Sequence, residues 1–147
     1  MVDQAAGAML KPDDLKRISE EIETAKIKEA VEKKRKFEEH QEHLRQEFMQ
    51  REIPDDAFQH LNNLVRHAAE NGQREVMLFK FPAEYCKDHG RAINNFDPSW
   101  PDTLTGFARK AYDAHTEHLK PHGYKLRAQV LDYPDGNLGE VGIFLSW

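Results

Sequence analysis

The side chains best suited to chemistry lie in one long connection of the chain, over residues 82–101. Six of them can bind a ligand or react, namely Cys86, His89, Arg91, Asn94, Asn95 and Trp100. A single helical turn in this segment would place Cys86 and His89 on one face, at i and i+3. An adjacent imidazole can activate a thiol, and an amide can orient that base. Because long connections inside compact domains are often functional, we treat the segment as a candidate ligand-binding or catalytic loop.

The same residues also have an ordinary structural interpretation. Unpaired cysteines are commonly small buried hydrophobic residues, and the acidic neighbours Glu84 and Asp88 do not stabilise a thiolate at Cys86. His89 suits the end of a short helix, where a cation meets exposed carbonyl groups. We therefore expect Cys86 to be structural, and the sequence assigns no catalytic residue.

Three histidines form a second candidate site. His115, His118 and His122 follow one another at i, i+3 and i+7 near the end of a predicted helix, a spacing that can share one transition-metal ion. His122 lies beyond Pro121, where helical geometry is expected to end. Histidines also interact favourably with the last carbonyl groups of a helix. Two interpretations stay open, a metal site and a polar margin of the core, and the sequence identifies no cofactor.

The composition and charge of the chain favour some functional classes over others. The formal net charge is −5, which argues against a dominant role in nucleic-acid binding because phosphate-binding domains are normally basic. The one basic cluster is Lys33, Lys34, Arg35 and Lys36, and glutamates flank it on both sides. The single cysteine excludes an intramolecular disulfide and suits a reducing compartment. No segment has the roughly 20 apolar residues of a membrane span, so we expect a cytoplasmic protein without a membrane partner.

A change of composition at Pro54 divides the chain into two parts. Residues 13–53 contain no Gly or Pro and are mostly charged, whereas 12 of the 14 aromatic residues follow Pro54. The first part can form a long solvated helix supported by acidic and basic side chains at i and i+4. We predict a disordered tail over residues 1–11, a charged helical arm over residues 12–53 and a compact domain over residues 54–147.

On a helical wheel, most apolar residues of the arm form one broad stripe, and such a stripe predicts a partner. The stripe comprises Leu15, Ile18, Ile22, Ala25, Ala30, Phe37, Leu44 and Phe48, whereas Ile27 and Val31 lie outside it. Polar residues in its middle disfavour a long coiled coil. We expect two contact zones. Residues 15–25 would bind another copy or another protein, and residues 37–48 would pack on the chain's own domain or on a second copy.

Residues 54–147 show the apolar periodicities of a small domain. Helices are predicted from Asp55-Asp56 to Asn71-Gly72 and from Asp102-Thr103 to about Lys120. Strands are predicted over residues 75–81, 124–130 and 141–147, the first largely covered on both faces. The last strand is the most apolar, so we place it at the centre of the sheet.

These patterns predict an α+β protein with a long charged N-terminal helix and a small two-layer domain. The predicted order is α-α-β-loop-α-β-β, with a three-stranded, mainly antiparallel sheet and helices on one face. The favoured function is a non-enzymatic interaction or regulatory module that assembles or docks through its N-terminal helix. The main alternative is a small enzyme or metal-dependent ligand-binding domain that uses residues 83–101 and the three histidines. Nucleic-acid association through residues 33–36 is a weaker alternative.

Overall fold

The computed structural model describes residues 8–147, so most of the tail predicted over residues 1–11 lies outside the described residues. Contacts within the described chain group it into two units, which divide between Leu44 and Arg45. One helix, α2 (Pro12–Gln50), supplies most of the first unit and the beginning of the second.

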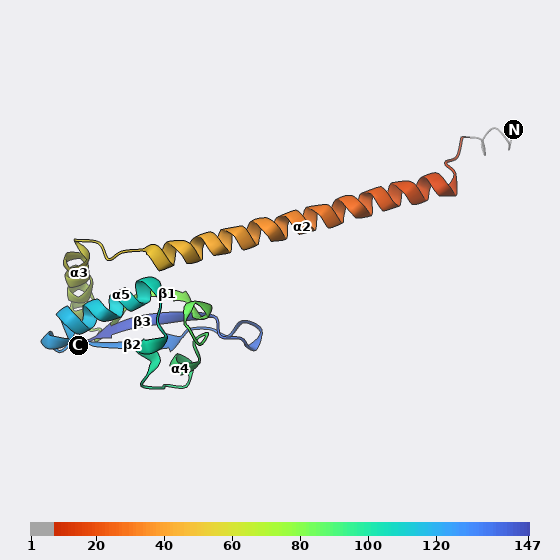
Figure 1. The fold of residues 1–147 in the computed structure, drawn as a ribbon. Helices are drawn as coiled ribbons and strands as arrows, with labels where there is room; N and C mark the ends of the chain where they lie inside the picture. The colour runs from red at the N-terminus through yellow and green to blue at the C-terminus, as the bar shows by residue number, and fades with distance from the viewer. Residues whose placement is uncertain (1–7) are drawn as a thin grey trace. The chain divides into compact units, whose positions relative to one another are not determined.

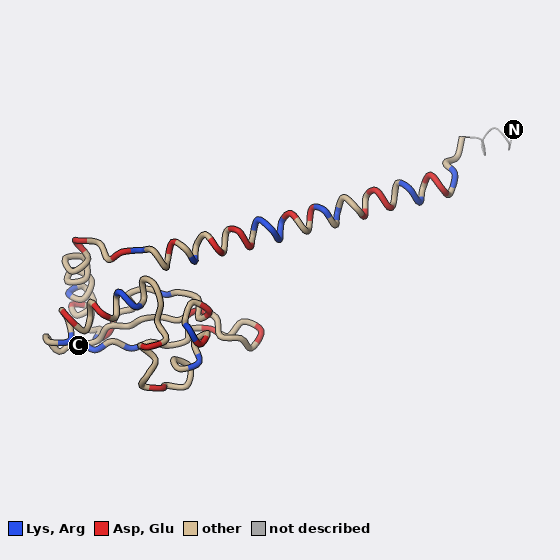
Figure 2. The backbone as a smooth tube through the Cα atoms, viewed as in Figure 1, with Lys and Arg blue, Asp and Glu red and all other residues tan. Residues whose placement is uncertain are grey.

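Helix α2 is 39 residues long, and none of its residues is buried. It begins at Pro12 with Asp13 and Asp14 in its first turn, where acidic side chains meet the positive end of the helix dipole. Acidic and basic residues alternate along it (Figure 2), and neighbours one turn apart form ion pairs such as Lys33 with Glu29 at 3.1 Å. Within residues 8–147, no helix combines the length and apolar composition needed to cross a membrane.

The second unit contains a three-stranded antiparallel sheet (Figure 1). Its strands are β1 (Glu75–Pro82), β2 (Lys125–Val130) and β3 (Glu140–Ser146), in the spatial order β1-β3-β2. The register places Leu145 of β3 between Val76 and Leu126 of the two outer strands. The predicted α+β class and the central position of the last strand are therefore confirmed.

Helices and connecting segments cover one face of this sheet. Helix α3 (Ala57–Glu70) buries Val65 and Ala68 beside Val76 and Leu145, and α5 (Gly106–Ala114) buries Ala108 in the larger part of the core. In Figure 1, α5 lies along the sheet and α3 stands at one end of it. The short helix α4 (Arg91–Asn94) adds Ile93 to the same core. The core residues of β3 are its alternate apolar positions, Val141, Ile143 and Leu145, each at most 1% exposed.

The other face of the sheet is open to solvent, which corrects the prediction that the first strand is covered on both faces. Met77 and Lys80 of β1 are exposed, and the register shifts between Met77 and Phe79. Arg127 of β2 lies 4.1 Å over the ring of Phe144 and donates hydrogen bonds to Glu75. These hydrogen bonds lower the pKa of the Glu75 carboxyl. A charged pair therefore covers the apolar ring on this face.

The compact unit begins before the boundary that composition indicated at Pro54. Phe48 and Met49, at the end of α2, pack against the larger core. The Phe48 ring lies 5.0 Å from the Tyr85 ring and 5.3 Å from the Phe81 ring, centroid to centroid. Two apolar residues in a charged segment change its average composition little, which is why composition placed the boundary too late.

The predicted helix over residues 102–120 is divided in the structure. A 3-10 turn, η2 (Trp100–Thr103), precedes α5, and a π-helical turn, η3 (His115–Leu119), and a 3-10 turn, η4 (Lys120–His122), follow it. Thr105 precedes the first residue of α5, with an extended backbone, and its hydroxyl donates to the Tyr85 carbonyl. That bond ties the start of α5 to the segment after β1.

Candidate functional site

Cys86 lies in the larger core, 3% exposed, among residues that include Tyr85, Ile93 and Leu104. Burial raises the pKa of its thiol to about 11, and a hydrogen bond with Thr103 offsets only part of that increase. A nucleophilic cysteine needs a lowered pKa and access to solvent. Cys86 has neither property, so its environment is that of a structural residue.

The predicted helical turn that would join Cys86 and His89 does not form. A 3-10 turn, η1 (Ala83–Tyr85), ends before Cys86, whose backbone is extended. His89 is exposed and has a positive φ of 59°. The cause is Asp88, whose carboxylate accepts the backbone N–H groups of Gly90 and Ala92 at 3.0 and 2.8 Å and so starts α4. The thiol and the imidazole therefore do not form a catalytic pair.

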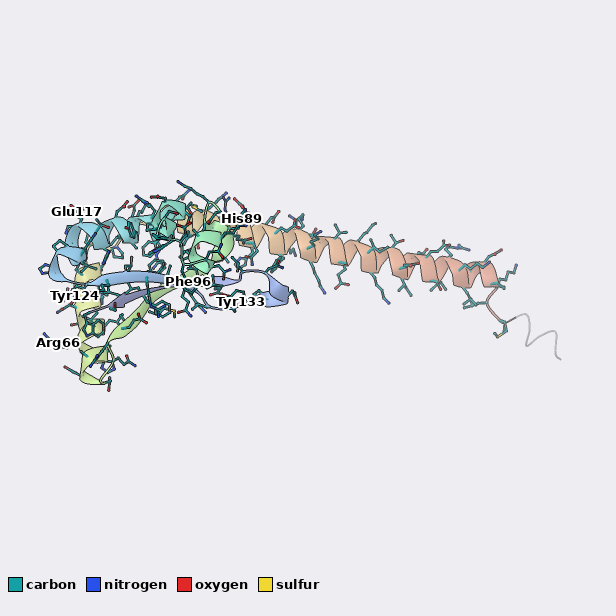
Figure 3. The ribbon with its side chains drawn as sticks, turned by 90° about the horizontal axis from the view of Figure 1, so that it is seen from below. Arg66, His89, Phe96, Glu117, Tyr124 and Tyr133 are labelled. Atoms are coloured by element: carbon teal, nitrogen blue, oxygen red, sulfur yellow. The ribbon has the colours of Figure 1, made fainter. Side chains whose placement is uncertain are left out.

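The remaining side chains of the loop are separated from one another. Asn94 accepts a hydrogen bond of 2.9 Å from the Tyr133 hydroxyl, which belongs to the turn between β2 and β3 (Figure 3). Arg91 and Asn95 are exposed, and the Trp100 ring packs against Tyr112 at 5.7 Å. The six predicted ligand-binding residues thus do not converge on one cavity. Each has a separate structural role or faces solvent.

The loop also holds an exposed aromatic residue that sequence analysis did not single out. Phe96 is 85% exposed and has a φ of 54°, a backbone conformation that is unusual for a bulky residue. Nothing in the residue pattern around Phe96 distinguishes it from a core aromatic. Its exposure depends on where α4 ends, which the sequence does not predict.

The three histidines point to different environments. His115 is 6% exposed, and its Nε2 donates to the Tyr124 carbonyl at 2.9 Å, while its buried Nδ1 has no hydrogen-bond partner among residues 8–147. His118 and His122 are exposed and line a shallow hollow of about 810 Å³ beside Phe58. The His118 ring meets the Phe58 ring edge-on at 5.1 Å.

Their separation removes the predicted metal triad. Among residues 8–147, no three His, Cys, Asp or Glu side chains gather in an arrangement that could hold a metal ion. The π-helical turn begins at His115, so the simple i, i+3, i+7 spacing no longer describes how the three side chains project. Of the two interpretations left open by the sequence, His115 fits the core margin.

A groove of about 340 Å³ lies between α3, β1 and α5, and it was not predicted. Its apolar lining includes Phe58, Leu61, Leu78, Phe79 and Phe107. These residues share no sequence motif. Each lies on the apolar face of a helix or strand, and periodicity alone predicts that such faces are covered in a closed core. The two helices do not meet closely enough to fill the space between them.

The first contact zone of α2 is the clearest candidate for a partner-binding surface. Leu15, Ile18 and Ile22 are 48%, 44% and 52% exposed, and Ala25 continues the same side of the helix. Side chains of this size are usually buried, and a row of them on one helix side marks an interaction surface. We call this row, Leu15, Ile18, Ile22 and Ala25, the α2 stripe.

The second zone is divided between two environments. Phe37 is 63% exposed and Leu44 is 39% exposed, whereas Phe48 is half-buried in the core of the second unit. The prediction offered the chain's own domain or a second copy as the cover for residues 37–48. The domain covers Phe48 at the end of this zone.

The basic cluster in the middle of α2 is largely paired within the helix. Lys33 and Lys34 face Glu29 and Glu38 at 3.1 and 4.0 Å, and Arg35 is hydrogen-bonded to both Glu32 and Glu39. These contacts raise the pKa of Arg35 above its usual value. Neighbouring carboxylates thus cancel much of the field that would attract a phosphate.

Comparisons of the chain with protein-family models, curated proteins and solved structures gave no match. A function must therefore be inferred from the geometry described above.

The Cys86 environment gives a direct prediction. At pH 8, iodoacetamide is expected to alkylate folded Cys86 at least about 100-fold more slowly than in the urea-unfolded chain, because the buried thiol is neutral and covered. The alkylation rate is measured by intact mass, with the unfolded protein as the control. Rapid alkylation of the folded protein that persists below pH 7 would show that the thiol is activated and would make the loop a catalytic candidate again.

Proposed function

We propose that the protein is a non-enzymatic interaction module that assembles with a second copy through the α2 stripe. One observation carries the proposal: α2 is a 39-residue helix in which no residue is buried, although large apolar side chains line one side of it. A helix with an apolar stripe gains stability when another apolar surface covers that stripe. In this proposal α2 joins two copies of the Arg45–Trp147 domain in one assembly.

The surroundings of the reactive side chains support a non-catalytic role. The Cys86 thiol is buried with a raised pKa, and His89 lies apart from it in solvent. A single buried cysteine is also compatible with a reducing compartment such as the cytoplasm, which we include in the proposal. Among the described residues, no feature of the loop or of the three histidines favours a second function.

The test compares substitutions on opposite sides of one helix. Ile18→Glu with Ile22→Glu places two charges in the α2 stripe, and sedimentation velocity should then give the monomer mass of 17.1 kDa at concentrations where the wild type sediments as a larger species. The matched control, Ile27→Glu with Val31→Glu, places the same charges outside the stripe and should preserve the wild-type mass.

Thermal unfolding of both variants, followed by circular dichroism, checks that the domain is intact. Its midpoint should change little in either variant, since the stripe lies outside the core of the second unit. A wild-type protein that is monomeric at every concentration would contradict self-assembly. Equal effects of the two variants would show that the α2 stripe is not the surface used.

A further inference from the structure

The residues at the start of α2 that lie on the side of the α2 stripe have the same spacing in both directions along the chain. We call this series of residues the seam. Glu29 continues the α2 stripe at one end on the helical wheel. At the other end, Lys11 directly precedes the first residue of α2, and its carbonyl accepts the N–H of Leu15 at 3.1 Å, which places Lys11 one turn before Leu15. The resulting series is Lys11, Leu15, Ile18, Ile22, Ala25 and Glu29, with steps of four and three residues that alternate symmetrically about its centre. A two-fold axis between Ile18 and Ile22 would therefore bring every member of the series opposite another member.

We infer that two copies of the chain pair antiparallel along residues 11–29, with Ile18 of one copy packed on Ile22 of the other. This inference rests on the proposed function, because it names the arrangement of the partner on the α2 stripe. The alternative for the same stripe is a parallel pair in register. Side-chain volume and charge both separate these two arrangements.

Side-chain volume favours the antiparallel pair. It places Leu15 opposite Ala25, so that each layer of the seam joins a large and a small residue or two isoleucines. A parallel pair would place Leu15 on Leu15, an ordinary layer, but also Ala25 on Ala25, which leaves a gap in that layer. A gap reduces the stability of a packed interface.

Charge favours the same arrangement at both ends of the seam. The antiparallel pair places Lys11 of each copy opposite Glu29 of the other, whereas a parallel pair would place Lys11 on Lys11 and Glu29 on Glu29. On one flank, Asp14 similarly meets Lys28 of the second copy. On that flank, Glu21 of one copy would face Glu21 of the other. This repulsive contact is exposed, and it costs less than the attractive pairs contribute.

Existing ion pairs within α2 do not prevent these contacts. Glu29 faces Lys33 at 3.1 Å, and Asp14 faces Arg17 at 2.8 Å, all four side chains being exposed. Exposed intrahelical pairs contribute little to stability, and a carboxylate can accept from two donors at once. Both acids can therefore keep the intrahelical partner while meeting the second copy.

The length of the seam sets the strength expected of the pair. After Glu29 the same side of α2 carries the charged residues Glu32, Lys33 and Lys36. The seam thus covers fewer than the three to four heptads that are typical of a stable coiled coil. We expect a dimer that forms and dissociates with concentration.

Charge reversal tests the arrangement in the full-length chain. In an antiparallel dimer, Lys11→Glu or Glu29→Lys alone turns two attractive pairs into repulsive ones and should raise the dissociation constant about tenfold. The double variant restores opposite charges and should return it to within about threefold of the wild type. Glu20→Lys, on the outer side of the helix, is the matched control for Glu29→Lys and should have little effect.

Disulfide trapping provides a second test that does not depend on affinity. Leu15→Cys and Ala25→Cys proteins are oxidised separately and as a mixture, with the wild type showing that buried Cys86 does not cross-link. An antiparallel pair predicts disulfide-linked dimers that contain one chain of each variant, formed only in the mixture. Dimers formed by each variant alone, without an effect of charge reversal, would establish a parallel pair and overturn the inference while leaving self-assembly intact. Absence of any dimer by sedimentation would instead overturn the proposed function.

Discussion

A fragment that begins at Arg45 is expected to unfold at nearly the thermal midpoint of the full chain, whereas a fragment that begins at residue 52 is expected to lose about 3–5 kcal/mol of stability or fail to fold. The reason is that only the shorter fragment lacks Phe48 and Met49, which pack on the core beside Phe81 and Tyr85. Removal of a packed aromatic side chain typically costs about this much. Thermal and urea unfolding, followed by circular dichroism, measure both fragments.

A matched pair of substitutions separates loss of packing from loss of chain length. Phe48→Ala in the full chain should destabilise the domain by about 3 kcal/mol. Phe37→Ala removes the same side chain from an exposed position of the same helix and should change stability by less than about 0.5 kcal/mol. Equal stability of the two fragments, or of the two variants, would contradict the assignment of the end of α2 to the compact unit.

The second large effect is expected at Gly106, where α5 begins against the end of α2. Gly106 has a φ of +52°, and a Cβ atom there would lie 2.8 Å from the Met49 Cα and 2.9 Å from the Phe48 carbonyl oxygen. These are backbone atoms, so they cannot move aside as a flexible side chain would. We expect Gly106→Ala to destabilise the domain by about 3 kcal/mol, through backbone strain and the steric clash together.

Gly123 supplies the control for this substitution. It also has a positive φ, of +95°, but apart from its own chain neighbours no atom of the described residues lies within 4 Å of the position that a Cβ atom would take there. Gly123→Ala should therefore cost only the strain of the left-handed conformation, about 1–2 kcal/mol. Equal losses in the two variants, measured by urea unfolding, would mean that the approach of Gly106 to α2 does not constrain the fold.

The sequence predicted those parts of the fold that depend on periodicity. The apolar face of α3 and the alternation of Val141, Ile143 and Leu145 were sufficient to predict a helix and the central strand. Periodicity put Phe48 in the contact zone over residues 37–48 but did not decide whether the chain's own domain or a second copy covers it, because its neighbours in the sequence are charged. It also did not predict the π-helical turn at His115, which accompanies a hydrogen bond from His115 to the carbonyl of Tyr124, nine residues further along the chain.

The candidate sites differ in how far the sequence could define them. The exposed α2 stripe follows from helical geometry alone, so its residues could be named before the structure was known. The pairing of Cys86 with His89 depended on an assumed helical turn, and the Asp88 carboxylate directs the backbone along another course. The groove near Phe58 and Leu61 depends on how closely two helices approach each other, which no local pattern encodes.

Sedimentation equilibrium of the full chain and of the Arg45–Trp147 fragment, over the same range of concentrations, tests self-assembly through α2 most directly. The fragment keeps the core-packing end of α2 and lacks the α2 stripe. We predict that the full chain shows a concentration-dependent equilibrium between monomer and dimer, and that the fragment is monomeric throughout. A full chain that remains monomeric, or a fragment that dimerises as strongly as the full chain, would contradict self-assembly through α2.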